Sequence, residues 1–274
     1  MSSKGRIKRL ADSILSPLDL TLARRHEVDR TTLPGVLAQL RRCGFEPATV
    51  IDVGAAYGMW SAACHERFPT ARFILIEPVE EYAPFLESHA AAWGGTYLQA
   101  AAASTSGTRQ INVHADLVGT SFFSETEGAE VDGTPRSVPS IQLDETCREL
   151  GATAPILMKL DVQGSELDVL EGATETLHLT EVIIMEVSFF GFFREAPSVV
   201  DVIASMADRG FVPYDILGLH HRPLDGALAQ ADVVFTRHDS GLRKIHSYAT
   251  PQQRSDQTLS ARSARAEFVS RLKK

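Results

Sequence analysis

The sequence has little cysteine and no long apolar run, and both scarcities narrow the classes of protein to which it can belong. Its 274 residues include only three cysteines, whose odd number and wide spacing fit neither a disulfide framework nor a zinc site. No stretch approaches the ~18 uninterrupted apolar residues that indicate a transmembrane helix. Charged residues and Pro17 interrupt the first 20 residues, which therefore lack the apolar centre of a secretory signal. We predict a cytoplasmic protein with no transmembrane segment.

Positive charge is scarce in the body of the chain. The net charge is −8, and residues 1–25 and 241–274 carry +4 and +6, so the rest of the chain carries −18. An acidic body disfavours nucleic-acid binding, which needs a positive surface against the phosphates. The basic ends suit either a peripheral contact with an anionic membrane or an acidic partner, or simple solvation as chain termini. No feature of the sequence indicates an oligomeric state.

Short apolar runs alternate with helical patterns along the chain, which is typical of a parallel sheet with crossover helices. Seven strands are predicted, at residues 49–53, 72–76, 97–101, 156–160, 181–187, 211–217 and 232–236. The loop between the last two strands is too short for a helix, which favours an antiparallel hairpin at the sheet edge. We therefore predict an α/β, Rossmann-like sheet of seven strands with helices on both faces and an antiparallel last strand.

Three further segments surround or interrupt this pattern. A helical arm is predicted at residues 1–30, before a domain of residues 31–240, and a basic tail at 241–274 contains a short helix near its end. Within the domain, residues 105–143 alternate like short strands between glycine-rich turns and predict a β insertion. The strands expected in this insertion lie at residues 109–113, 120–123 and 137–143.

The segment from Val50 to Gly58 is the clearest local signal for a ligand. A buried strand ends in an acidic residue, a turn of small residues follows, and a helix begins at once. The backbone of such a turn can approach a ligand closely, and the helix N-terminus can bind a carboxylate. A dinucleotide turn beginning at Gly54 would need glycine, or a close substitute, at positions 56 and 59, where the sequence has Ala56 and Met59. This mismatch favours adenosylmethionine over NAD. The predicted cofactor-binding residues of this segment are Asp52, Gly54, Ala55, Ala56, Tyr57 and Gly58.

Glu77 ends the second predicted strand, where the acidic residue of a nucleoside site holds the ribose hydroxyls. Its carboxylate can accept two hydroxyl hydrogen bonds, and the alternative is that it caps the following helix. Pro78, next along the chain, and Ala101, at the end of the third predicted strand, are expected to complete the cofactor site.

The most distinctive motif lies at residues 159–173. Lys-Leu-Asp-Val-Gln-Gly-Ser-Glu at 159–166, followed by Val-Leu-Glu-Gly-Ala at 169–173, resembles the FkbM-type methyltransferases. The turn after the first strand, Ile-Glu-Pro at 76–78 and the segment 222–235 are similar to other motifs of that family. The resemblance implies a class I methyltransferase fold, adenosylmethionine as cofactor, and methylation of a hydroxyl on a sugar, glycan or polyketide-type small molecule.

The resemblance also implies roles for single residues. Asp52, Gly54 and Gly58 would form the cofactor turn, Glu77 would hold the ribose, and Asp161 would face the methyl-transfer site. The spacing of the strands agrees, because Asp161 ends a strand beside the cofactor strand and so points into the same crevice.

Four side chains are candidates for the transfer itself. The Asp161 carboxylate can hold the amino group of the cofactor or take the proton of an alcohol. Glu186, near the end of the next strand, can act beside it, and the two can form an oxygen-ligand site for Mg²⁺. His220 and His221, in the loop between the last two strands, are either alternative general bases or inert surface residues. Gln163 stands where this family often has an acidic residue, so no role that needs negative charge is expected there.

The aromatic segment from Phe189 to Phe193 follows a strand end on the ligand side. It suits an apolar lid or acceptor wall, and the equal alternative is lid packing without acceptor contact. Besides a small-molecule O-methyltransferase, two hypotheses remain open. One is an adenosylmethionine-binding scaffold without turnover, and the other, less favoured, is a nicotinamide-dependent dehydrogenase.

Overall fold

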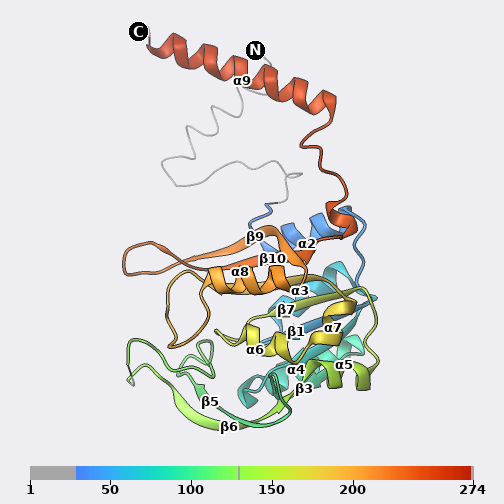
Figure 1. Ribbon diagram of the computed structural model, residues 1–274, viewed down its shortest axis with the longest axis vertical. Coiled ribbons are helices and arrows are strands. Elements are labelled where there is room, and N and C mark those ends of the chain that lie inside the picture. The colour runs from blue at the N-terminus through green and yellow to red at the C-terminus, as the bar shows by residue number, and fades with distance from the viewer. Residues whose placement is uncertain (1–28, 129, 273–274) are drawn as a thin grey trace. The chain divides into compact units, whose positions relative to one another are not determined.

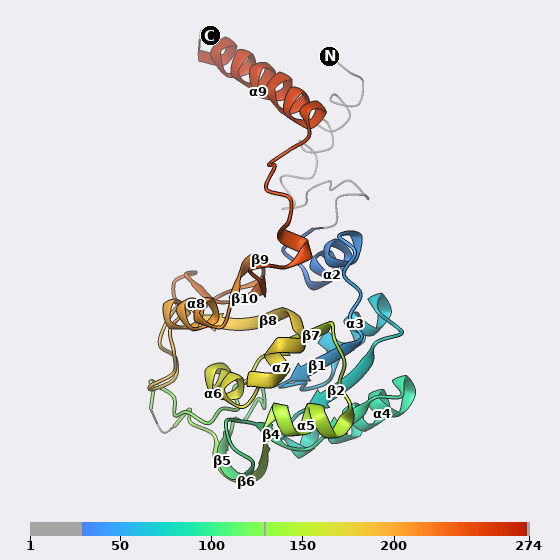
Figure 2. The ribbon, with the colours of Figure 1, turned by 45° about the vertical axis from the view of Figure 1, so that its right-hand side comes forward.

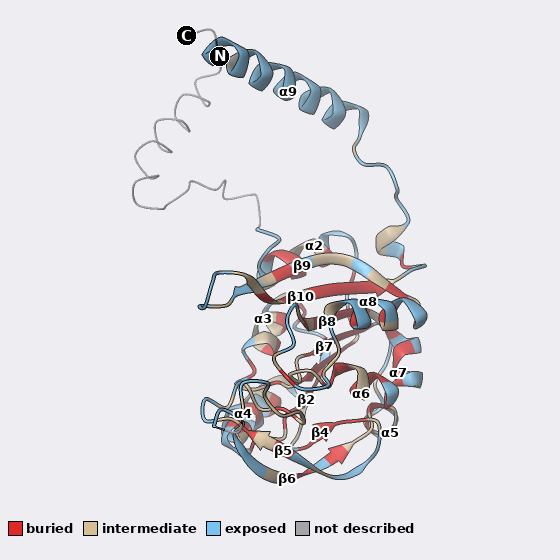
Figure 3. Ribbon diagram, turned by 60° about the vertical axis from the view of Figure 1, so that its left-hand side comes forward, coloured by how far each residue is buried: buried red, intermediate tan, exposed pale blue. Residues whose placement is uncertain are grey.

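The structure, a computed structural model, describes residues 29–128 and 130–272. Its contacts divide the chain into two compact units, Met1–His238 and Asp239–Lys274. The predicted N-terminal arm falls outside the described residues except for its last two positions. In the second unit, the helix that we expected near the end of the tail is longer. It is α9 (Pro251–Leu272), along which the described side chains are exposed (Figure 3).

The first unit is built on a seven-stranded sheet (Figure 1). Its strands are β1 (Thr49–Val53), β2 (Arg72–Ile76), β3 (Thr96–Leu98), β7 (Ile156–Leu160), β8 (Thr180–Ser188), β9 (Phe211–His221) and β10 (Leu228–Arg237). Their order is β3-β2-β1-β7-β8-β10-β9, and β10 alone runs antiparallel to its neighbours, β8 and β9. The predicted fold class and edge hairpin are therefore confirmed. The strand order reverses between β1 and β7, which is the point where open α/β sheets bind their ligands.

Helices pack on both faces of this sheet (Figure 2). They are α2 (Leu33–Arg42), α3 (Met59–Arg67), the short 3₁₀ helix η2 (Glu80–Tyr82), α4 (Ala83–Trp93), α5 (Leu143–Leu150), α6 (Glu166–Glu171), α7 (Thr174–Leu179) and α8 (Val199–Asp208). One core cluster joins alternate strand residues, such as Ile51, Met158 and Ile183, to side chains of α5 to α8. The intervening strand residues point to the opposite face because side chains alternate along a strand, and α3 contacts β1 there.

The two central strands are buried along their whole length, which explains why their sequences are nearly continuous apolar runs. Each run is broken by one charged residue, Asp52 in β1 and Lys159 in β7. These two residues lie directly opposite each other in the parallel pairing. The sheet therefore carries buried charge next to its switch point.

The predicted β insertion forms a separate three-stranded sheet. It contains β4 (Ala101–Ala102), β5 (Gly107–Val113) and β6 (Thr134–Ile141), in the order β4-β6-β5. The expected strand at residues 120–123 is wrong, because only Ser121 pairs there, in a single bridge with Asn112. The Ser121 hydroxyl instead accepts from the Phe123 N–H and donates to the Gln163 carbonyl, and these bonds hold the segment as a loop.

Two other sequence predictions need correction. The expected strand at 97–101 is two elements, since β3 ends at Leu98 and β4 joins the small sheet. His220 and His221 do not lie in a loop, because β9 continues to His221 through an irregular pairing with β10. The connecting loop is shorter than expected, and an ion pair between Arg222 and Asp225 closes it.

Candidate active site

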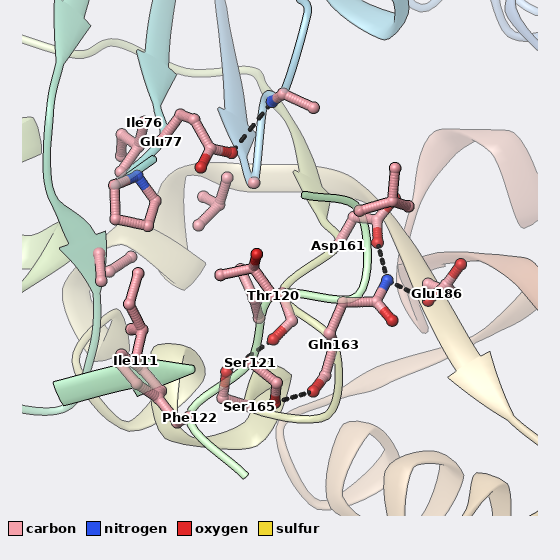
Figure 4. Close-up of a pocket in the computed structure, with 18 of the residues that line it drawn as sticks. Ile76, Glu77, Ile111, Thr120, Ser121, Phe122, Asp161, Gln163, Ser165 and Glu186 are labelled. Atoms are coloured by element: carbon pink, nitrogen blue, oxygen red, sulfur yellow. Dashed lines mark hydrogen bonds between the residues drawn. The ribbon is translucent and has the colours of Figure 1, made fainter. Parts of the chain in front are cut away.

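A cavity of about 380 Å³ opens at the carboxyl ends of the central strands, next to the switch point (Figure 4). The main sheet and the segments that follow its strands contribute Gly54, Ala56, Glu77, Pro78, Asp161, Gln163, Glu186, His220 and Gln230. The small sheet and the loop after β5 contribute Ala101, Ile111, Leu117, Val118, Thr120, Ser121 and Phe122. One wall of the cavity is therefore polar and comes from strand ends, and the other is largely apolar and comes from the β insertion.

The turn after β1 brings its backbone against the end of β7. Gly54 has a φ of +78°, and a Cβ added to it would lie 1.9 Å from the carbonyl oxygen of Asp161. The N–H groups of Gly54 and Ala55 both donate to the Ile76 carbonyl, which ties the turn to β2. Gly58, with a φ of +75°, stands at the start of α3 without a side-chain cap. The turn therefore fits together only with glycine at position 54, as the sequence pattern predicted.

Glu77 is buried at the end of β2 and links two segments of the cavity wall. One carboxylate oxygen accepts from the Ala56 N–H at 3.0 Å, and the other accepts from the Val79 N–H at 2.9 Å. Burial raises the pKa of Glu77 to about 7, although these two hydrogen bonds act in the opposite direction. The capping alternative is wrong, because neither η2 nor α4 begins with a side-chain cap, and the Glu77 carboxylate lines the cavity.

Four of the predicted cofactor residues do not line the cavity, namely Asp52, Ala55, Tyr57 and Gly58. The Asp52 carboxylate is buried and accepts from the Ser61 hydroxyl of α3 at 2.6 Å, so it joins α3 to β1. Burial raises the pKa of Asp52 to about 6. Ala55 is buried within the turn. Tyr57 is half exposed and packs edge-on against Tyr82, with ring centroids 4.6 Å apart.

Lys159 is the buried cation of the site, and the sequence prediction gave it no role. Its Nζ lies 2.5 Å from Asp232 of β10 and 3.3 Å from Asp161. Burial acts to lower the pKa of Lys159, but the charges of Asp161 and Asp232 outweigh it and raise that pKa above its ordinary value. A lysine in an otherwise apolar strand indicates that an acidic partner lies nearby, because lysine is almost never fully buried unless it is paired.

Asp161 and Glu186, the predicted catalytic carboxylates, meet across an amide group. The Gln163 Nε2 donates to Asp161 at 3.0 Å and to Glu186 at 2.9 Å (Figure 4). The Gln230 Nε2 of β10 donates to the same oxygen of Glu186 at 2.8 Å. Burial and the nearby charge of Asp161 raise the pKa of Glu186 well above its ordinary value. The sequence identified both carboxylates but neither glutamine, because the pairing depends on contacts between distant segments.

The predicted metal site finds no support. Across residues 29–128 and 130–272, the His, Cys, Asp and Glu side chains form no group of three that could hold a metal ion. Asp161 and Glu186, the two ligands that we expected for Mg²⁺, instead share the amide nitrogen of Gln163. Both carboxylates therefore bond to a neutral donor at the place where a shared cation would bind.

The histidines and phenylalanines at the mouth take different positions. Both histidines are exposed, but only His220, which pairs with Gln230, lines the cavity. The Phe189–Phe193 segment lines a second cavity of about 90 Å³, which shares Glu186 with the main one. Within the segment, Phe193 is buried, and Phe190 is partly exposed beneath the Arg222 guanidinium at 4.0 Å.

A mostly parallel α/β sheet with a ligand cavity at its switch point and a reversed β10 defines a methyltransferase-type fold. Residues 52–213 match the FkbM methyltransferase domain. The chain belongs to the FkbM methyltransferase family.

Individual relatives share limited parts of the chain. The 2-O-methyltransferase NoeI of Sinorhizobium fredii (strain NBRC 101917 / NGR234) is 43% identical over 66 residues, which are 24% of this chain and 27% of NoeI. The match therefore spans about a quarter of that relative. The FkbM methyltransferase of Methylobacillus flagellatus KT aligns with a TM-score of 0.44 and 17% identity, over 68% of this chain and 43% of its own. The magnesium protoporphyrin IX methyltransferase of Synechocystis PCC 6803 aligns with a TM-score of 0.44 and 11% identity, over 86% of this chain and 98% of its own.

Among the described residues, no helix is both long enough and apolar enough to cross a bilayer.

Proposed function

We propose that this protein is an S-adenosylmethionine-dependent O-methyltransferase that acts on a hydroxyl of a sugar, glycan or polyketide-type small molecule. The observation that carries the proposal is the meeting, in one cavity, of the Gly54 turn, the Glu77 carboxylate and the Asp161–Glu186 pair. Family membership and the short match to a 2-O-methyltransferase support an oxygen acceptor.

The polar end of the cavity suits adenosylmethionine. The absence of a Cβ at Gly54 keeps the turn close to β7, and the Gly54 and Ala56 backbone of this turn lines the cavity, where it can approach a ligand closely. Each oxygen of Glu77 accepts one backbone hydrogen bond and has a second lone pair for a ribose hydroxyl. The volume of about 380 Å³ falls within the range of ~300–1,000 Å³ typical of small-molecule sites.

The other wall suits an acceptor with both apolar and hydroxyl surface. Ile111, Leu117, Val118 and Phe122 supply apolar contacts there, and Thr120 adds a hydroxyl. Such a mixture of apolar lining and a few polar groups is typical of sites that orient a small molecule. We expect the acceptor to bind against this wall, with its reacting hydroxyl toward the carboxylate pair.

In the proposed mechanism, bound adenosylmethionine supplies an electrophilic methyl group on a positively charged sulfur. Glu186 accepts the proton of the acceptor hydroxyl, which makes the oxygen a better nucleophile. Because its pKa is raised well above the ordinary value, Glu186 acts as the base only in its deprotonated form, which becomes more abundant as the pH rises. Lys159 lies beside Asp161 and offsets its charge. Asp161 lines the cavity next to the Gly54 turn, where its carboxylate can hold the amino group of the cofactor. Alignment of the two reactants supplies much of the remaining rate enhancement.

The test is a binding titration followed by a transfer assay. The protein should bind adenosylhomocysteine and not NAD in calorimetry, and it should transfer a labelled methyl group to members of a panel of glycosides and polyketides. Binding without transfer to any acceptor would favour the scaffold hypothesis. Binding of NAD in place of adenosylhomocysteine would favour the dehydrogenase and refute the proposal.

A further inference from the structure

Gln163 has an unusual backbone conformation that places its amide between the two carboxylates. Its φ is +52°, in the left-handed region that side chains other than glycine rarely adopt. The Ser121 hydroxyl donates to its carbonyl at 2.7 Å. Such a conformation persists only where surrounding contacts hold it, and it commonly marks a functional site. The cavity wall therefore fixes the backbone of Gln163 while the side chain reaches Asp161 and Glu186.

The amide acts at this point as a double donor. A primary amide nitrogen has two hydrogens, and the two carboxylates, at 3.0 Å and 2.9 Å, account for both. Without a donor between them, two carboxylates in one partly buried site repel each other. Lys159 lies beside Asp161, and Gln230 bonds to Glu186, but Gln163 alone joins the pair among the contacts found in the described residues.

We propose that Gln163 is a positioning residue whose amide takes the place of a bridging cation, so that the Asp161–Glu186 pair works without Mg²⁺. The inference rests on the proposed function, because it gives both carboxylates a part in methyl transfer. It also accounts for the lack of fit between the site and a metal ion, since both carboxylates bond to the nitrogen that would exclude a cation. The amide keeps the two acids at a fixed separation and leaves their remaining lone pairs for the reactants.

Two near-isosteric variants separate the donor role from the shape of the side chain. Gln163→Met keeps the length and removes both hydrogen bonds, so we expect kcat to fall by about 10–100-fold, because small displacements of reacting groups have effects of that size. Adenosylhomocysteine affinity and the KM for adenosylmethionine should stay close to those of the wild type. Gln163→Glu adds a third carboxylate, and three oxygen ligands should create Mn²⁺ binding, detectable by electron paramagnetic resonance, that the wild type lacks.

Three controls complete the experiment. Gln110→Glu, on the exposed face of β5, should leave turnover and Mn²⁺ binding unchanged. Ser121→Ala releases the Gln163 backbone without altering its amide, and it should lower kcat in the same direction but less. Wild-type turnover should survive EDTA.

Different results overturn different claims. The inference is overturned if EDTA abolishes wild-type turnover and Mg²⁺ restores it, if the wild type binds Mn²⁺ as well as Gln163→Glu does, or if folded Gln163→Met retains full turnover. A wild type that binds no adenosylhomocysteine would overturn the proposed function, and the inference with it.

Discussion

The geometry of the site depends on one buried charge, the ammonium group of Lys159. Lys159 lies in a strand that is otherwise apolar, and its ammonium group lies between Asp161 of the same segment and Asp232 of β10. A buried lysine without a partner would be strongly unfavourable, and the two acids without the lysine would repel each other. The residue thus joins the central strand to the reversed strand and orients a carboxylate of the cavity.

Removal of this cation should weaken the fold. We expect Lys159→Met to lower the free energy of unfolding by about 2–4 kcal/mol, because Asp161 and Asp232 lose their shared partner. Urea denaturation measures the change, with the exposed Lys244→Met as the control. The double variant Lys159→Met/Asp232→Asn should recover part of the loss. A Lys159→Met protein as stable as the control would show that the ion pairs have no net effect.

Glu186 is the residue for which a change should affect the chemistry most directly. Glu186→Gln keeps the shape of the side chain and removes the base, so we expect kcat to fall by about 10²–10⁴-fold. Calorimetry with adenosylhomocysteine should give an affinity near that of the wild type, because the proposed cofactor contacts do not include Glu186. If turnover stays normal in this variant, His220 becomes the base to test.

At the scale of elements, the turn between β1 and α3 sets the distance between two strands. Its tight packing has a steric origin, since a Cβ on Gly54 would overlap the backbone of Asp161. Gly94, at the end of α4, has a comparable φ of +67° and nothing within 4 Å of the same added atom. Substitution of Gly94 therefore causes backbone strain alone, whereas substitution of Gly54 also causes a steric overlap with Asp161.

Gly54→Ala and Gly94→Ala form a matched pair. Both place a Cβ in the left-handed region, which costs about 1–3 kcal/mol, and thermal denaturation should show this loss in each. Only Gly54→Ala should also abolish adenosylhomocysteine binding, because the turn must move away from β7. Equal affinities in the two variants would contradict the proposed cofactor turn.

The sequence predicted some elements well and others poorly, for physical reasons. The strands at 49–53, 72–76 and 156–160 have the predicted bounds, because central parallel strands are buried on both faces and read as uninterrupted apolar runs. The edge strand β9 extends four residues past its predicted end, since half-exposed strands have a weaker pattern. In the site, the strand-end acids were predictable from local spacing. Gln230 and Ser121 were not, because their roles come from contacts made across the fold.

For the whole molecule, three buried acids link stability to pH. Burial raises the pKa of Asp52 to about 6 and the pKa of Glu77 and Glu166 to about 7, from ordinary values of 3.8 and 4.5. Between those ordinary values and about pH 7, the folded chain holds more protons than the unfolded chain. Their contribution to stability is therefore complete at low pH and is lost as the pH rises through the folded-state values.

Glu166 offers a test of this linkage. Its carboxylate accepts from the Val162 and Gly164 N–H groups, and Glu166→Gln keeps an acceptor oxygen while removing the titration. We expect the unfolding free energy of the variant to fall less steeply than that of the wild type between about pH 5 and about pH 8, at ~1.4 kcal/mol for each unit of pKa difference removed. Urea denaturation at several pH values measures both slopes. Slopes equal to each other and to that of the exposed control Glu66→Gln would exclude a contribution from this group.

Because of the small sheet, the lining of the cavity comes from two separate stretches of sequence. The ends of β1, β2 and β7 carry the proposed cofactor contacts, whereas β5 and the loop after it carry the apolar wall. Apart from Ser121, whose hydroxyl bonds to the Gln163 carbonyl, residues of the second stretch can change without altering the proposed cofactor contacts. Related enzymes can therefore change their substrates by replacing one contiguous segment. A chimera that receives residues 107–141 from another member of the family should accept the substrate of that member.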